Sequence, residues 1–145
     1  RHRRGEQWRH QHRRPVQAPT GAALSVMPNP FGAPEISVQE VKRKLDADEP
    51  VVMLDVREPY ELLRAAIKDS RVLPTPVSRL AQFQLDGLPA EAQPQNADIV
   101  VFCHHGVRSA QVTMWLRQQG WTNVRSMAGG IDAWAREIDS SVGHY

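Results

Sequence analysis

Cysteine is scarce in this sequence of 145 residues, because Cys103 is the only one. A single cysteine cannot form a disulfide within the chain, which excludes the small secreted scaffolds that depend on such bonds. No apolar run approaches the roughly 18 residues that a membrane-spanning helix needs. We therefore expect a protein of a reducing, cytoplasmic compartment, with no membrane partner.

The basic residues are distributed unevenly. Residues 1–31 hold six arginines and one glutamate, whereas the remaining sequence has more acidic than basic residues. This segment has no apolar periodicity, so we expect disorder. It is either a basic arm for nucleic acid or an acidic surface, or a non-native stretch translated from upstream of the true start. The first residue is Arg, no apolar secretory signal is present, and Met27 precedes the foldable sequence, which favours the second interpretation.

We therefore expect residues 1–33 to be a dispensable leader, residues 34–145 to form the folded domain, and no nucleic acid to bind. In that domain, short apolar runs without alternation are typical of strands buried on both faces. They alternate with amphipathic segments, which predicts an α/β domain with a small, mainly parallel central sheet and helices on both faces. Strands are expected at 51–54, 72–74, 98–102 and 124–127, helices at about 37–47, 59–64, 77–85, 108–119 and 131–138, and a surface loop at 87–95.

Cys103 follows the strongest predicted strand and precedes a predicted helix. Backbone N–H groups and the positive end of that helix should converge on its sulfur and favour a thiolate. Gly106 allows loop angles that let several N–H groups point inward, and Arg108 adds a permanent charge. A free cysteine is more commonly a small buried hydrophobe. The glycine, the arginine and two histidines beside it favour a functional cysteine instead.

Three stretches carry a family resemblance. The segment Cys103-His104-His105-Gly106-Val107-Arg108-Ser109-Ala110 resembles the active-site loop of the rhodanese family of sulfurtransferases. Leu54 to Glu58, followed by Glu61, resembles the first motif of that family, and Met127 to Trp134 resembles its C-terminal signature. The three motifs occur in the family's order over about residues 36–138. One segment departs from the pattern, because Ala65 to Ser70 stands where the family usually has Gly-His-Ile-Pro-Gly-Ala.

The resemblance implies a two-step reaction. Cys103 would take a sulfane sulfur from thiosulfate or another small anionic donor, hold it as a persulfide, and pass it to a thiol, cyanide or a sulfur-carrier protein. This thiol–sulfur exchange requires no cofactor.

The neighbours of Cys103 have candidate roles. Arg108 either binds an anionic donor or pairs with Asp55 or Glu61 as a structural brace, and the brace is favoured. Arg57 is expected at the mouth of the pocket. His104 and His105 are expected at its rim with partial positive charge, and no metal is expected because adjacent side chains splay apart. Val107 and Ser109 complete the loop.

Alternative functions differ in how they use the same loop. A phosphatase of related fold has five residues between its cysteine and arginine, whereas four separate Cys103 from Arg108 here, which favours sulfur over phosphate. A regulatory module with an inactive site would normally lack the cysteine. The tail, residues 139–145, resembles the end of rhodanese domains attached to ubiquitin-like-protein activating enzymes, so a sulfur-delivery module remains an alternative.

The leader is tested by truncation. If it is dispensable, deleting residues 1–26 leaves the thermal unfolding midpoint and the sulfurtransferase rate unchanged, because the folded domain and its loop are intact. A large loss of either would instead indicate a role for the basic arm.

Overall fold

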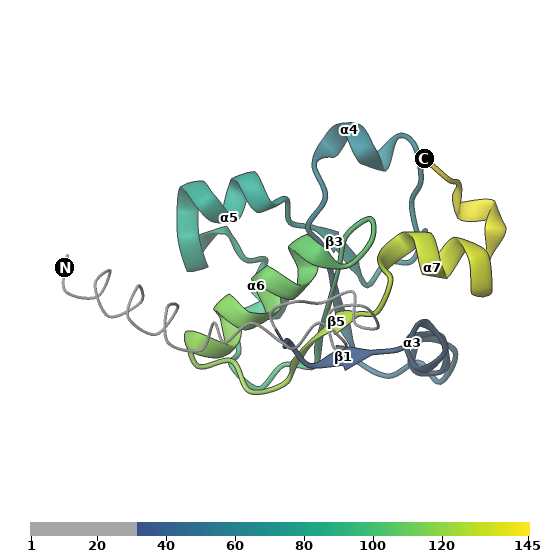
Figure 1. The fold of residues 1–145 in the computed structure, drawn as a ribbon. Helices are drawn as coiled ribbons and strands as arrows, with labels where there is room; N and C mark the ends of the chain where they lie inside the picture. The colour runs from purple at the N-terminus through teal and green to yellow at the C-terminus, as the bar shows by residue number, and fades with distance from the viewer. Residues whose placement is uncertain (1–31) are drawn as a thin grey trace.

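A computed structural model describes residues 32–145, and its centre is a five-stranded sheet (Figure 1). The strand order is β1-β5-β4-β2-β3, and every pair of neighbours is parallel. This confirms the predicted parallel sheet. β1 was not predicted, because two residues at the sheet edge carry no periodicity. The strands are β1 (Glu35–Ile36), β2 (Val52–Asp55), β3 (Val72–Pro74), β4 (Ile99–Phe102) and β5 (Val124–Met127).

The helices lie close to the predicted ranges. α6 starts at Val107, one residue before the earliest predicted start. Among the described residues, no helix is long and apolar enough to span a membrane. The helices are α3 (Val38–Asp46), α4 (Pro59–Leu62), α5 (Val77–Phe83), α6 (Val107–Gln118) and α7 (Gly130–Glu137), with 3-10 turns at Gln84–Gly87, Ala90–Ala92 and Ser140–Val142.

Helix α3 shows how local sequence starts an element. The Ser37 hydroxyl accepts a hydrogen bond from the backbone N–H of Glu40 at 3.0 Å, which satisfies one of the unpaired donors at the helix start. Three apolar side chains recur at helical spacing and are buried against the sheet: Val38, Val41 and Leu45.

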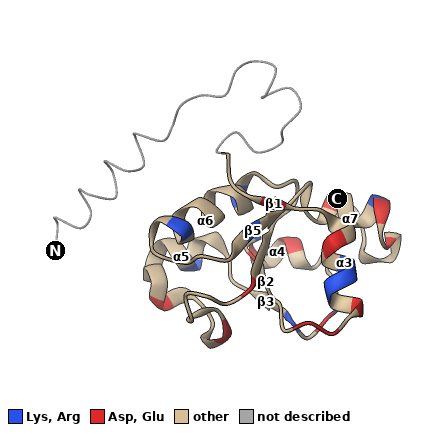
Figure 2. Cartoon of the chain, turned by 90° about the horizontal axis from the view of Figure 1, so that it is seen from below, with Lys and Arg blue, Asp and Glu red and all other residues tan. Residues whose placement is uncertain are grey.

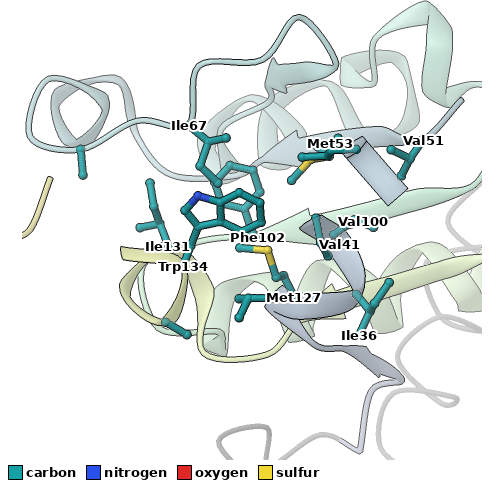
Figure 3. Close-up of a cluster of buried hydrophobic side chains, with 14 residues drawn as sticks. Ile36, Val41, Val51, Met53, Ile67, Val100, Phe102, Met127, Ile131 and Trp134 are labelled. Atoms are coloured by element: carbon teal, nitrogen blue, oxygen red, sulfur yellow. The ribbon is translucent and has the colours of Figure 1, made fainter. Parts of the chain in front are cut away.

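Two hydrophobic clusters lie on opposite faces of the sheet. Consecutive strand residues point to opposite sides, so Met53 and Leu54 belong to different clusters. The cluster drawn in Figure 3 joins the sheet to α3 and α7 and contains Phe102 and Trp134. The other joins it to α5 and α6 and contains Leu116. Figure 2 shows these helix pairs on either side of the strands, which confirms helices on both faces.

Two segments that were predicted to be irregular are more ordered than expected. In the predicted loop 87–95, Leu88 and Ala92 are buried in the core. In the tail, residues 139–145, for which no helix was predicted, Ser140–Val142 form a 3-10 turn, and Val142 and Tyr145 pack against the cluster beside α7. Residues 1–31 of the expected leader lie outside the described residues, so their dispensability stays a prediction.

Burial predicts a contrast between two leucines. Leu116 is fully buried, whereas Leu63 is 88% exposed. Leu116→Ala should lower the free energy of unfolding by about 2–5 kcal/mol, because it leaves a cavity in the core. Leu63→Ala should change it by less than about 0.5 kcal/mol. Urea unfolding measures both, and equal losses would contradict this assignment of the core.

Candidate active site

Cys103 lies at the carboxyl end of β4, the strand between β2 and β5. Ligands bind at this edge of parallel sheets in α/β folds. The residue is 1% exposed, so its sulfur sits at the bottom of the loop that leads into α6. Gly106 begins that helix with a φ of 113°, an angle that side-chain-bearing residues rarely adopt. The glycine therefore lets the chain turn sharply from strand to helix around the sulfur.

The Cys103 sulfur is the focus of this turn. It accepts hydrogen bonds from the backbone N–H groups of Gly106 at 3.1 Å and Ser109 at 3.4 Å. The Ser109 hydroxyl oxygen lies 3.5 Å from the same sulfur. Backbone donors at a helix start favour an anion over a neutral group. The site can thus hold a sulfur that carries negative charge.

The other side of the loop is fixed by α7. The carbonyl oxygens of Cys103 and His104 accept hydrogen bonds from the N–H groups of Ile131 and Asp132, at 2.9 and 3.0 Å. This approach requires Gly130, because a Cβ there would lie 2.5 Å from the Cys103 carbonyl oxygen. The Gly-Gly turn of the C-terminal motif therefore brings α7 against the cysteine loop.

Arg108 is held by Glu61 from α4. Its two terminal nitrogens donate to the two carboxylate oxygens at 2.7 and 2.9 Å. The carboxylate also accepts from the backbone N–H of Glu58 at 3.0 Å. The pKa of Glu61 is lowered to about 2, mainly by the hydrogen bonds from Arg108. Of the two carboxylates considered as partners for Arg108, the structure places Glu61 against it, and Asp55 pairs elsewhere.

Arg57 does not face the mouth of the pocket, and that expectation was wrong. Its side chain is fully buried and pairs with Asp55 through two hydrogen bonds, at 2.9 and 2.7 Å. The two residues are separated by one position, so the arginine folds back onto the end of its own strand. The buried guanidinium also donates to the hydroxyl of Tyr145 at 3.1 Å.

The two histidines differ from the expectation in two ways. Their rings do not splay apart but stack, with centroids 3.9 Å apart, and a carboxylate of Asp132 lies 3.9 Å from His105 Nδ1. The two planes are 29° apart, and ligand atoms of His104, His105 and Asp132 all lie within 4.8 Å of one another, so these three side chains could hold a metal ion, and the expectation that splayed side chains exclude one was wrong. Partial burial, together with the neighbouring His105, lowers the pKa of His104, so it carries less charge at neutral pH than expected. His105 and Val107 are exposed at the loop surface.

Two residues near the loop were missed by sequence reasoning. The Ser126 hydroxyl lies 2.7 Å from that of Ser109, and both residues are fully buried. The position of Ser126 between Arg125 and Met127 in the last predicted strand gave no clear signal, because β5 already contains a charged residue. The ring of Tyr145 stacks on His104 at 3.8 Å, and no local pattern pointed to it.

The segment that departs from the family pattern lies beside this tail. Ala65 and Ile67 are buried in the core, and the N–H of Ala66 donates to the carbonyl oxygen of Val142 at 3.0 Å. The unusual segment and the tail therefore pack together.

A family model described as a rhodanese-like domain matches residues 37–137. The chain belongs to the rhodanese-like family. A sulfurtransferase from Allochromatium vinosum is 32% identical over 102 residues, which cover 70% of this chain and 88% of that protein. The adenylyltransferase and sulfurtransferase MOCS3-2 of Zea mays is 29% identical over 86% of this chain, but the match spans only 25% of the maize protein.

Solved structures agree with this rhodanese-like assignment. The human single-domain sulfurtransferase TSTD1 matches with a TM-score of 0.58 and 27% identity, over 73% of this chain and 98% of that one. A rhodanese-related protein from Thermoplasma volcanium matches with a TM-score of 0.58 and 30% identity, over 72% and 93%. These relatives are sulfurtransferases or rhodanese-related proteins, and the match covers almost the whole of some and a quarter of the maize protein.

Acid unfolding tests the Glu61 pair. Because the pKa of Glu61 falls from 4.5 to about 2 on folding, its charge stabilises the fold above pH 4.5, and this contribution is lost as the pH falls toward 2. Wild type should therefore lose up to about 3 kcal/mol more stability than Glu61→Gln across that window. Urea unfolding at stepped pH measures the difference.

The matched control is Glu91→Gln, which removes an exposed carboxylate. Its pH dependence should follow that of wild type. If Glu61→Gln and wild type lose stability in parallel, the buried pair does not form in solution.

Proposed function

We propose that this protein is a sulfurtransferase that carries a sulfane sulfur on Cys103 as a persulfide. The observation that carries the proposal is the convergence of the Gly106 and Ser109 N–H groups on the Cys103 sulfur, at 3.1 and 3.4 Å. Such donors stabilise a thiolate in the free enzyme, and after transfer they face the sulfur that remains bonded to carbon. The sulfurtransferase relatives support the same chemistry.

The first half-reaction transfers sulfur to the enzyme. The Cys103 thiolate attacks the outer sulfur of thiosulfate or a similar donor, and a new S–S bond forms. The S–S bond of the donor breaks, and sulfite leaves with its electron pair. The enzyme is left with a persulfide that bears one negative charge, so no metal, oxidant or organic cofactor is needed.

The second half-reaction regenerates the thiolate. An acceptor thiolate or cyanide attacks the outer sulfur of the persulfide, the bond to the Cys103 sulfur breaks, and the cysteine leaves as the thiolate. The products are an acceptor persulfide or thiocyanate. Two separate half-reactions through a covalent intermediate give ping-pong kinetics.

The setting of the loop suits an anionic donor. The start of α6 carries partial positive charge, and Arg108 is about one-third exposed while its charge is oriented by Glu61. Arg108 therefore braces the loop, while most of its charge is balanced by the ionised carboxylate of Glu61. A phosphatase is less well supported, because within the described residues only two backbone N–H groups reach the cysteine sulfur.

A protein sulfur carrier is a second candidate for the acceptor of the sulfur atom. Relatives that combine adenylyltransferase and sulfurtransferase names, and a putative sulfur carrier protein from Bacillus subtilis, match this chain over 86% and 77% of its length. These names favour a protein sulfur carrier as an acceptor, beside low-molecular-weight thiols and cyanide. A cytoplasmic location would provide the reducing thiols for either route.

Intact-mass spectrometry tests the persulfide. Thiosulfate treatment should add the mass of one sulfur atom to the wild-type chain, because Cys103 is its only cysteine. Cyanide should then remove that mass with the release of one equivalent of thiocyanate.

Two controls complete the test. Cys103→Ser should gain no sulfur, since a serine hydroxyl is not ionised at neutral pH. Hydrolysis of an aryl phosphate by a wild-type protein that gains no sulfur would instead support the phosphatase. An unmodified mass with every donor would contradict the proposed mechanism.

A further inference from the structure

Tyr145 adds a side-chain link between two ion pairs of the site, beside the hydrogen bond that Arg57 Nη1 donates to the Glu61 carbonyl oxygen at 3.3 Å. Its hydroxyl donates to Glu61 Oε1 at 2.9 Å and accepts from Arg57 Nη1 at 3.1 Å. The same Glu61 oxygen accepts from Arg108 at 2.9 Å. The phenol therefore links the Asp55–Arg57 pair to the Glu61–Arg108 pair. Burial raises the pKa of Tyr145, so its hydroxyl stays protonated and able to donate.

The ring of Tyr145 makes a second contact with the active-site loop. It stacks on the imidazole of His104 with centroids 3.8 Å apart and planes 8° apart. His104 directly follows Cys103, and its carbonyl oxygen is held by α7. The Tyr145 side chain thus contacts the loop at His104, in addition to the hydrogen bond from α7.

The tail that carries Tyr145 is fixed in place. The carbonyl oxygen of Val142 accepts from the N–H of Ala66, and Val142 itself packs against the core. Gly143 has a φ of 105°, and a Cβ there would lie 2.6 Å from the Arg64 carbonyl oxygen. Figure 1 shows the C-terminus beside α4, the helix that holds Glu61. The tail therefore packs against Arg64 and against the start of the segment Ala65 to Ser70, which departs from the family pattern.

We infer that Tyr145 is a positioning residue for sulfur transfer: its hydroxyl fixes Glu61, and through Glu61 the brace Arg108, while its ring fixes His104 beside Cys103. Only the expected effect on the rate of sulfur transfer rests on the proposed function. The structural effect of Tyr145 concerns the backbone N–H groups that face the Cys103 sulfur, and these can be followed without any substrate.

Three variants separate the contributions of Tyr145. Tyr145→Phe removes both hydrogen bonds of the hydroxyl and keeps the stacked ring. Tyr145→Leu removes the ring as well. Gly143→Val displaces the tail and leaves the tyrosine in the sequence. The matched control is Tyr60→Phe, because Tyr60 is 70% exposed and lies outside this network.

The first measurement is amide hydrogen exchange in the substrate-free protein. Loss of one or two hydrogen bonds should accelerate exchange at Gly106 and Ser109 by about tenfold in Tyr145→Phe. Tyr145→Leu and Gly143→Val should show a larger acceleration. Exchange in β4 and β2 should stay at the wild-type rate, which a general loss of stability would not allow.

The second measurement is the steady-state rate of sulfur transfer from thiosulfate to cyanide. We expect kcat to fall about tenfold in Tyr145→Phe and further in Tyr145→Leu. KM should change little, because the substitutions alter the position of the Cys103 sulfur and not the binding of the donor. The control Tyr60→Phe should match wild type in both measurements. In a double-mutant cycle, Tyr145→Phe should add little to Glu61→Gln, since both act through one carboxylate.

The outcomes are distinct. Wild-type exchange rates at Gly106 and Ser109 in Tyr145→Phe and Tyr145→Leu would overturn the inference, as would exchange that accelerates equally throughout the sheet. Should wild type transfer no sulfur, the proposed function fails, and amide exchange alone decides whether Tyr145 positions the loop.

Discussion

The active-site loop depends on the hydrogen bonds that the buried carboxylate of Glu61 accepts. This carboxylate accepts hydrogen bonds from both terminal nitrogens of Arg108, from the N–H of Glu58 and from the hydroxyl of Tyr145. Removing one partner of such a pair leaves an uncompensated buried charge, which is strongly destabilising. The pair therefore holds α4, which follows β2, at a fixed distance from α6, which follows β4, although the two helices lie far apart in the sequence.

The loop is also fixed by the directions of its own peptide groups. The carbonyl oxygens of Cys103 and His104 point to α7, whereas the N–H groups of Gly106 and Ser109 point to the sulfur. The sulfur consequently meets donors that are already oriented and need no rearrangement when charge develops on it. Preorganised donors of this kind favour the charged state of a reaction over its neutral state. This is the physical basis of the proposed persulfide chemistry.

Much of the architecture follows from local sequence. The apolar run at 99–102 has no polar alternation, so a strand buried on both faces could be predicted, and Cys103 was placed correctly at its end. β1 is two residues long, which is too short for any periodicity. The pairing of Arg57 with Asp55 was missed, because an arginine after a strand is usually solvated and burial depends on neighbours that the sequence does not locate.

The longer-range contacts needed the structure. Tyr145 is 84 positions from Glu61, and no spacing rule connects a tail residue to a buried carboxylate. The stacking of His104 on Tyr145 depends on the same tail. By contrast, the two candidate carboxylate partners of Arg108 could be named from the sequence, Asp55 at the end of β2 and Glu61 in α4, and only the fold could choose between them.

The central claim, that Cys103 carries the transferred sulfur, is tested most directly by isotope labelling of thiosulfate. The account predicts that label in the outer sulfur becomes bound to the protein with one atom per chain, is chased by cyanide, and is absent from Cys103→Ser. Label in the inner sulfur should leave entirely as sulfite. Label that never binds to the wild-type protein, or that binds equally from both positions, would contradict the account.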